Sequence, residues 1–152
     1  MNILIYTQCF APSLGGIESV MTNIATQATH LGHQVKVLAD GSKYYSSKFD
    51  STQKFEIHRF DQFKFLRKKI KLNFAKNLIK ENNFDVAIFD SWKSLESFEK
   101  DKKLKKICLV HGNEILKLNH SRRILSSLKN ANHIVFNSIF TQKLFFKNFK
   151  KL

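Results

Sequence analysis

The chain has 152 residues, of which 43% are hydrophobic and 25% charged. This length suits one globular domain, and the composition excludes a disordered chain. No apolar run approaches the ~20 residues that cross a bilayer, and the first apolar stretch is too short for a signal peptide, so we expect a cytoplasmic location. The net charge of +14 predicts attraction to an anionic surface, polymer or phosphate-bearing substrate.

The two cysteines give little sign of special chemistry. Cys9 and Cys108 lie far apart and have no CxxC or His-rich company. A metal site or a disulfide framework is therefore not indicated, and we expect buried free thiols.

The first third of the chain predicts a strand-helix-strand unit. The apolar run from Asn2 to Tyr6 predicts a buried strand, and the breaker cluster from Ala11 to Gly16 predicts a loop. Apolar residues then recur at helical spacing from Ile17 to Leu31, and Gly32 is placed to end that helix. A second strand follows at Gln34 to Ala39, with a connection long enough for a right-handed crossover.

The middle of the chain predicts a loop, a strand and a basic helix. Residues Gly41 to Gln53 are polar and lack periodicity, and a short strand is expected at Phe55 to Phe60. Leu66, Ile70, Phe74 and Leu78 form one i, i+4 row of a helix that ends near Asn82 and Asn83.

The rest of the chain continues the alternation. Buried strands are expected at Asp85 to Asp90 and at Lys106 to Val110, with helix potential between them from Lys93 to Lys100. The remaining predicted elements are a helix near Leu118 to Leu128, a strand at His133 to Phe136, and a helix from Thr141 to Phe149 capped near Ser138.

This alternation predicts an α/β fold. We expect one Rossmann-like domain over residues 1–152, with a doubly wound, mainly parallel sheet flanked by helices. Ligands of such sheets gather at the carboxyl ends of the strands. Four predicted loops share that edge: Gly15-Gly16, Asp90-Ser91-Trp92, His111-Gly112-Asn113-Glu114 and Asn137-Ser138.

The glycine loop is a candidate phosphate site. Gly15 and Gly16 would place unhindered N–H groups at a helix N-terminus, although a tight turn explains them as well. The loop has neither GxGxxG nor GxxxxGK[ST] spacing, so NAD and ATP chemistry are not supported. Glu18 lies in the first turn of the helix, where capping is the simpler explanation.

His111 is the candidate for chemistry at the second half of the edge. It directly follows a predicted strand, and Gly112 would let the backbone turn sharply after it. The imidazole could donate to a substrate hydroxyl or to a sugar oxygen near a reacting carbon. Glu114 either orients His111 or begins the next helix.

Three segments in order carry a family resemblance: MNILIYTQCFAPSLGGIESVMTNIATQATHLGHQVKVLAD, ICLVHGNEI and ANHIVFNSIFTQKLF. They resemble the N-terminal, acceptor-side domain of GT-B glycosyltransferases of family 4. The resemblance implies a nucleotide-sugar donor, a glycan or lipid-linked acceptor, retention, and no metal or other cofactor.

The resemblance also assigns residue roles. It implies that Gly15 and Gly16 approach the donor diphosphate and that His111 lies by the reaction centre. The remaining candidates, for acceptor contact or support, are Glu18, Asp90, Asn113, Glu114 and Ser138.

The family's C-terminal domain normally supplies a basic pair for the diphosphate and an E-x7-E motif. No two glutamates of this sequence are eight apart. We therefore expect a C-terminal transferase domain or subunit to be needed. The alternative is a non-catalytic Rossmann-like module that binds a phosphate-bearing ligand, a partner protein or a membrane.

The stretch from Phe63 to Lys80 has seven basic residues and no acid. It is typical of a helix at an anionic membrane surface, here the inner face of the membrane, but a solvated helix whose apolar row packs on the sheet explains it equally well. Nucleic acid ranks below lipid as the anionic partner because no nucleic-acid-binding motif accompanies the charge.

Overall fold

A computed structural model describes residues 1–42, 46–100, 103–116 and 120–149. Their strands form a six-stranded, all-parallel sheet in the order β3-β2-β1-β4-β5-β6, which confirms the predicted Rossmann-like α/β fold. The chain divides into two compact units, Met1–Ala87 and Ile88–Leu152. The strand β4 (Val86–Phe89) contains the boundary between them.

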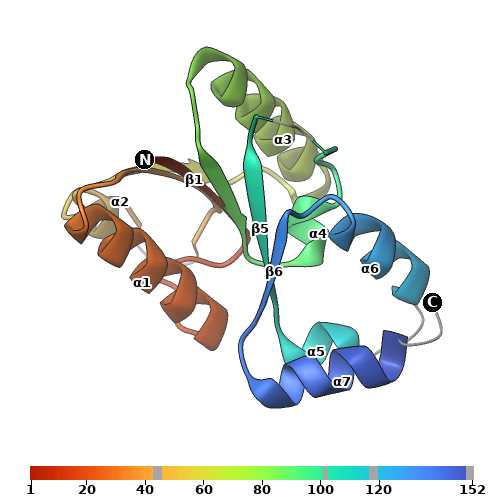
Figure 1. Ribbon diagram of the computed structural model, residues 1–152. Coiled ribbons are helices and arrows are strands. Elements are labelled where there is room, and N and C mark those ends of the chain that lie inside the picture. The colour runs from red at the N-terminus through yellow and green to blue at the C-terminus, as the bar shows by residue number, and fades with distance from the viewer. Residues whose placement is uncertain (43–45, 101–102, 117–119, 150–152) are drawn as a thin grey trace. The chain divides into compact units, whose positions relative to one another are not determined.

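The first unit confirms the predicted strand-helix-strand opening (Figure 1). Its elements are β1 (Asn2–Thr7), α1 (Gly16–His30), β2 (Gln34–Asp40), α2 (Ser46–Asp50), β3 (Glu56–Phe60) and α3 (Lys64–Glu81). Ile5 of β1 is in register with Val37 of β2, which is paired in turn with Ile57 of β3. Gly32 has a φ of 81°, the left-handed conformation expected after a helix end.

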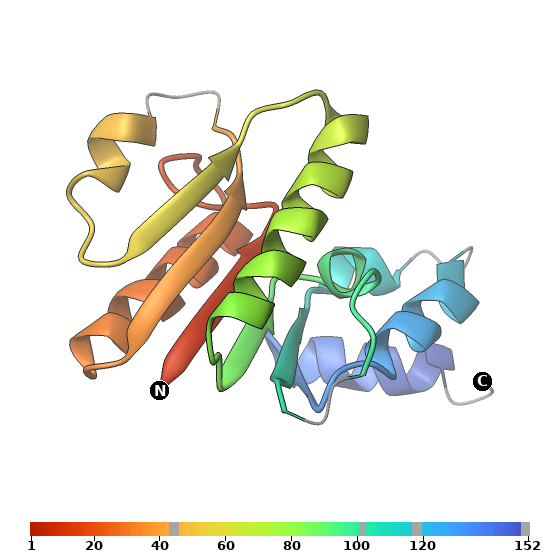
Figure 2. The ribbon, with the colours of Figure 1, turned by 90° about the horizontal axis from the view of Figure 1, so that it is seen from above.

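The core of this unit forms on both faces of its strands. Leu4, Ile5, Val37 and Leu38 are fully buried because both faces of a parallel sheet are covered by helices. The helices α1 and α3 cover opposite faces, as Figures 1 and 2 show. Met21 and Ala25 are the residues that α1 buries completely.

The second unit contains the predicted later strands and helices. They are α4 (Trp92–Leu95), β5 (Lys105–Val110), α5 (Gly112–Ile115), α6 (Ser121–Leu128), β6 (His133–Phe136) and α7 (Ile139–Phe149). The predicted start of α6 at Leu118 lies outside the described residues. An aromatic cluster joins β6 to α7, with the ring centroids of Phe136 and Phe145 5.3 Å apart.

Two local predictions were wrong. The predicted loop from Gly41 to Gln53 contains the short helix α2, which the polar sequence did not indicate. The helix potential from Lys93 to Lys100 is realised only in its first residues, since α4 ends at Leu95. Short helices of this kind depend on tertiary contacts, because helix nucleation is unfavourable without them.

The helix α3 follows the predicted apolar row only toward its C-terminal end. Leu66 and Ile70 of that row are 53% and 41% accessible, whereas Leu78 is buried and the ring of Phe74, 36% accessible, lies 5.6 Å from the ring of Phe60 on β3. Lys71 and Ala75 are the other buried residues of the helix. The explanation that the apolar row packs on the sheet therefore holds for Phe74 and Leu78 and fails for Leu66 and Ile70.

Both cysteines are free thiols, as predicted, although only Cys108 is fully buried and Cys9 is half-buried. Among the described residues, no helix is long and apolar enough to span a membrane.

Candidate functional site

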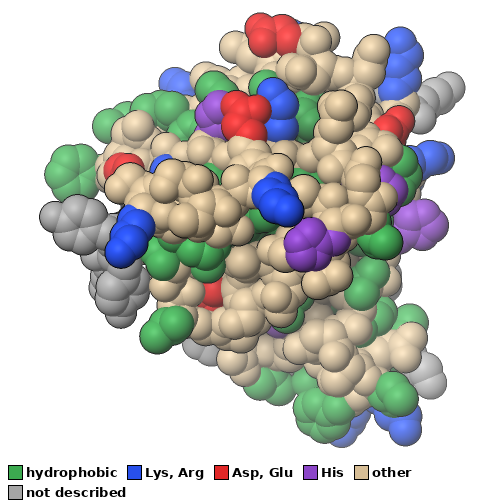
Figure 3. Space-filling view, turned by 90° about the vertical axis from the view of Figure 1, so that its left-hand side faces the viewer, with side chains coloured by type: hydrophobic (Ala, Val, Ile, Leu, Met, Phe, Trp, Pro, Cys, Tyr) green, Lys and Arg blue, Asp and Glu red, His purple; other side chains and the backbone are tan. Residues whose placement is uncertain are grey.

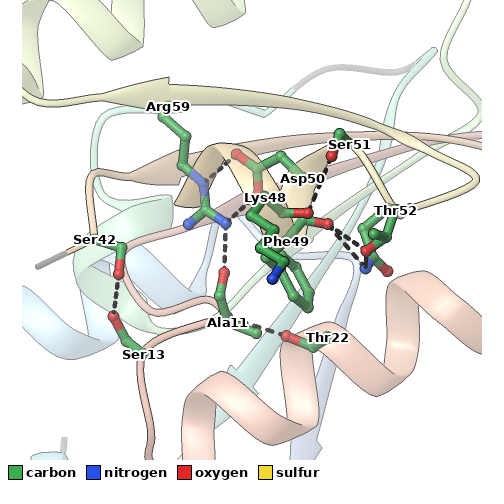
Figure 4. A network of polar contacts seen from close by, with 11 residues as sticks. Ala11, Ser13, Thr22, Ser42, Lys48, Phe49, Asp50, Ser51, Thr52 and Arg59 are labelled. Carbon is green, nitrogen blue, oxygen red and sulfur yellow. Dashed lines mark hydrogen bonds and ion pairs between the residues drawn. The ribbon is translucent and has the colours of Figure 1, made fainter. Parts of the chain in front are cut away.

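Hydrogen bonds from neighbouring elements hold the loop that follows β1 (Figure 4). The backbone N–H of Ala11 donates to the hydroxyl of Thr22 on α1 at 3.2 Å. The hydroxyls of Ser13 and Ser42 lie 3.0 Å apart, which connects the loop to the segment after β2. The loop that leads to the two glycines is therefore fixed at several points.

A buried ion pair also positions this loop. Arg59 of β3 donates from Nε to Asp50 Oδ2 at 3.1 Å and from Nη2 to Asp50 Oδ1 at 2.7 Å, and it donates to the carbonyl oxygen of Ala11. The two side chains are only 8% and 19% exposed. A bidentate pair with this little exposure is rigid, so β3 and α2 together position the glycine loop.

Sequence reasoning did not identify Arg59 or Asp50 as important. The available signal was the cation Arg59 beside Phe60 near the end of a predicted strand, nine residues after the acid Asp50 in a segment predicted as a loop. Charges in such positions are seldom buried unless they are paired.

The two glycines lie where they were expected, before and at the start of α1. Both are exposed, and a Cβ atom on Gly16 would meet nothing within 4 Å. A Cβ on Gly15 would lie 2.1 Å from the Glu18 carboxylate, because this side chain turns back toward the start of its helix. Glu18 thus occupies the favourable position for an acid in the first turn.

His111 lies at the carboxyl end of β5 and caps the short helix α5. Its backbone N–H donates to Glu114 Oε1 at 2.9 Å, while its imidazole faces the backbone N–H of Glu114 as the other half of a capping box. The Nε2 atom is buried and has no hydrogen-bond partner in the described structure. The tautomer that accepts at Nδ1 carries its proton on Nε2, where the ring can donate it.

Glu114 is an unusual carboxyl group for a capping residue. Burial and, to a smaller extent, the nearby charge of Asp90 raise its pKa to about 7, against the opposing effects of the His111 N–H and of Lys93. Near neutral pH this group therefore exists in both protonation states. Glu114 lies in the first turn of α5 and accepts from the backbone N–H of His111, while its orientation of the imidazole stays a prediction.

Asp90 supports this cluster from the end of β4. It is 1% exposed and accepts hydrogen bonds from the hydroxyls of Ser94 at 2.5 Å and Ser91 at 3.2 Å. Burial, together with the charges of Glu114 and Asp90, raises the pKa of the Cys108 thiol well above its usual range. Cys108 is therefore a buried, unreactive thiol at neutral pH.

Ser138 caps α7, as predicted. Its hydroxyl accepts from the backbone N–H of Thr141 at 3.1 Å and lies 3.0 Å from the hydroxyl of Thr141. Thr141 is 2% exposed and donates to Asn137 Oδ1 at 2.6 Å. Ser138 itself remains exposed beside this network.

Gly112 follows His111 where the extended backbone of β5 changes to the helix α5, of which it is the first residue. Among the described glycines only Gly32 has the left-handed φ that favours glycine, so the change of direction after His111 does not require a glycine. A Cβ on Gly112 would meet Thr141 Oγ1 at an ordinary 3.6 Å. Asn113, the next residue, is exposed on α5.

The second unit thus brings three of the candidates together. His111, Glu114 and Asp90 meet at the ends of β4 and β5, and α7 with Ser138 and Thr141 contacts α5. This arrangement offers a buried N–H donor at His111 and a carboxyl group that titrates near neutrality. No group of three potential metal ligands occurs within the described ranges.

A model of Glycosyltransferase Family 4 matches residues 14–150, which is most of the chain. The matched range contains Gly15, Gly16, His111 and the capping residues described above. No curated protein sequence matches the chain.

Proposed function

The chain belongs to glycosyltransferase family 4, and from this premise we propose that it forms the acceptor-side half of an enzyme that transfers a sugar from a nucleotide-sugar donor to an acceptor hydroxyl. The acceptor in this proposal is a glycan or a lipid-linked molecule. The observation that carries the proposal is the buried, unpartnered Nε2 of His111 at the carboxyl end of β5. An N–H donor in this position can hold a sugar oxygen near the reacting carbon.

The capping box gives His111 the properties that this role needs. The imidazole faces the N–H of Glu114 in this capping box, which favours one orientation of the ring. Preorganised donors are effective because they need no rearrangement during the reaction. Glu114 and Asp90 act through His111 in this proposal, whereas Gly15 and Gly16 approach the donor diphosphate with their backbone N–H groups.

We further infer that transfer requires a C-terminal domain or a second subunit. The support is the family assignment together with exposed apolar side chains on α7, where Ile139 and Phe140 are each 72% and Phe146 52% accessible. Apolar residues gathered in this way often mark an interface. The second domain would supply the basic pair and the glutamates that bind the donor.

The experiment measures donor binding and sugar transfer. UDP- and GDP-sugars are titrated into the chain by calorimetry, alone and with a co-expressed C-terminal domain, and turnover is then measured for His111→Ala. We expect activity only with the second domain present, and a fall in kcat of about 100-fold in the variant.

His30→Ala is the matched control, since His30 is exposed at the end of α1. Unchanged turnover in His111→Ala would refute the role of that residue. No donor binding in any combination would instead favour the non-catalytic binding module, the second candidate, which the exposed basic face of α3 also supports.

A further inference from the structure

The helix α3 presents apolar side chains to solvent over its N-terminal part and its middle. Phe63 and Phe65, at its N-terminal end, are 88% and 91% exposed, and Leu66, Ile70 and Phe74 continue the row. Figure 3 shows one face of the molecule, on which hydrophobic side chains lie singly and in small groups among other side chains and backbone, as is usual on protein surfaces. The row of Leu66, Ile70 and Phe74 differs from such scattered side chains, because residues four apart lie next to one another along one side of a helix.

Buried polar contacts fix the rotation of this helix. Lys71 donates from Nζ to Asp40 Oδ1 at 2.6 Å and to the carbonyl oxygen of Thr7 at 2.7 Å. One turn earlier, Arg67 Nε lies 3.0 Å from Asp40 Oδ2. These contacts hold Arg67 and Lys71 toward the sheet, so that Leu66 and Ile70 face outward.

Positive charge accompanies the apolar row. Lys64, Lys69, Lys76 and Lys80 are all exposed, and the segment from Phe63 to Lys80 contains no acidic residue. Since a helix turns once in about 3.6 residues, Lys69, Lys76 and Lys80 lie on the same outward side as Leu66. From Phe63 to Lys80 the exposed face therefore combines apolar and cationic groups without an acidic residue, and the exposed Glu81 follows as the last residue of the helix.

We propose that this face of α3 binds the surface of a membrane that contains anionic lipids. Interfacial helices insert apolar side chains at the headgroup boundary while Lys residues contact anionic headgroups. Duplex nucleic acid would use the charge but leave the exposed Phe63 and Phe65 in water. The inference goes beyond sugar transfer and does not depend on it, since it requires neither donor nor acceptor.

Vesicle flotation tests the proposal with the full chain. Vesicles of phosphatidylcholine alone are compared with vesicles that also contain phosphatidylglycerol. Binding is expected only to the anionic vesicles and should weaken as salt rises, because salt screens the Lys charges. Binding to a short DNA duplex without binding to either vesicle would overturn the proposal.

Two variants and their matched controls locate the binding face. Lys69→Glu with Lys76→Glu should lower the vesicle partition coefficient at least about thirtyfold, given the usual contribution of each Lys near an anionic surface. Phe65→Ser should lower it roughly tenfold. The controls are Lys105→Glu with Lys129→Glu, which changes the net charge equally, and Leu31→Ser, at a side chain that is 75% exposed.

Circular dichroism confirms that each variant is folded. Retained binding in the α3 variants, or an equal loss in the Lys105 and Lys129 control, would refute a specific role for α3. Because no sugar nucleotide is present, failure here leaves the proposed transferase function untouched, and failure of sugar transfer leaves this inference untouched.

Discussion

At the scale of single residues, the candidate site depends on polar groups that are buried in pairs. The backbone N–H of His111 donates to the carboxylate of Glu114, and the imidazole of His111 faces the backbone N–H of Glu114. The Nε2 atom of His111 is buried and has no hydrogen-bond partner in the described structure. Buried donors of this kind cost free energy unless a ligand satisfies them. The free-energy cost of leaving His111 Nε2 unpaired therefore fits a role in binding a substrate oxygen. Sugar-transfer kinetics of His111→Ala test this role.

Glu114 gives a prediction for the pH dependence of stability. Its folded pKa, about 7, lies above the ordinary 4.5, so the folded state holds this proton more tightly than the unfolded state. The Glu114 contribution to the free energy of unfolding is therefore favourable at low pH. It is lost as pH rises from about 4.5 to about 7.

In Glu114→Gln this loss should disappear, while the amide oxygen can still accept from the His111 N–H. Relative to wild type, the variant should gain on the order of 2 to 3 kcal/mol between acidic pH and pH about 8. Urea denaturation across this range measures the difference. Glu99→Gln, at an exposed position, is the charge-matched control, and parallel pH profiles for wild type and Glu114→Gln would contradict the prediction.

At the scale of elements, α3 shows how one ion pair can override an apolar pattern. The sequence places Leu66, Ile70 and Phe74 in a regular row, but the buried contacts of Lys71 with Asp40 and with the end of β1 decide which side packs. Lys71 Nζ also lies 4.4 Å from the centroid of the Tyr6 ring, a favourable cation-π distance.

Replacing this lysine should therefore destabilise the first unit. Lys71→Met removes one ion-pair partner of the partly buried Asp40 and keeps its pair with Arg67, and we expect a loss of about 3 kcal/mol in the free energy of unfolding. Denaturant unfolding measures it. Lys76→Met, exposed on the same helix, should change stability by less than about 0.5 kcal/mol, and equal effects of the two substitutions would show that Lys71 is not a structural anchor.

At the scale of the whole molecule, exposed apolar surface is concentrated on particular elements. On α7, Phe140 and Phe146 are largely exposed, although Phe145 and Phe149 of the same helix are buried with stacked rings 4.7 Å apart. The helix α7 is thus apolar on two sides. The side with Phe145 and Phe149 packs within its unit, and the side with Phe140 and Phe146 is exposed and available to a partner.

We expect the isolated chain to self-associate through this side of α7. Its sedimentation coefficient should rise with concentration, and Phe140→Ser with Phe146→Ser should abolish the rise while leaving thermal stability nearly unchanged. Leu31→Ser is the control, since it removes an exposed apolar side chain from α1. Monomeric behaviour of the wild type at high concentration would count against an interface on α7.

The sequence by itself determined the alternating strands and helices, and with them the parallel Rossmann-like sheet. Buried parallel strands and amphipathic helices such as α1 have periodic apolar patterns that need no long-range information. It also determined the positions of Gly15, Gly16, His111 and the Ser138 cap, because each lies at a boundary between two predicted elements.

Only the tertiary structure decided which groups are buried and what they contact. The Arg59 and Asp50 pair, the short helix α2 that supplies Asp50, and the outward rotation of α3 all arise from contacts between residues distant in sequence. Apolar periodicity could not reveal them, since a charged side chain is buried only when a distant partner compensates its lost hydration. The raised pKa of Glu114 has the same origin, because burial beside Asp90 exists only after folding.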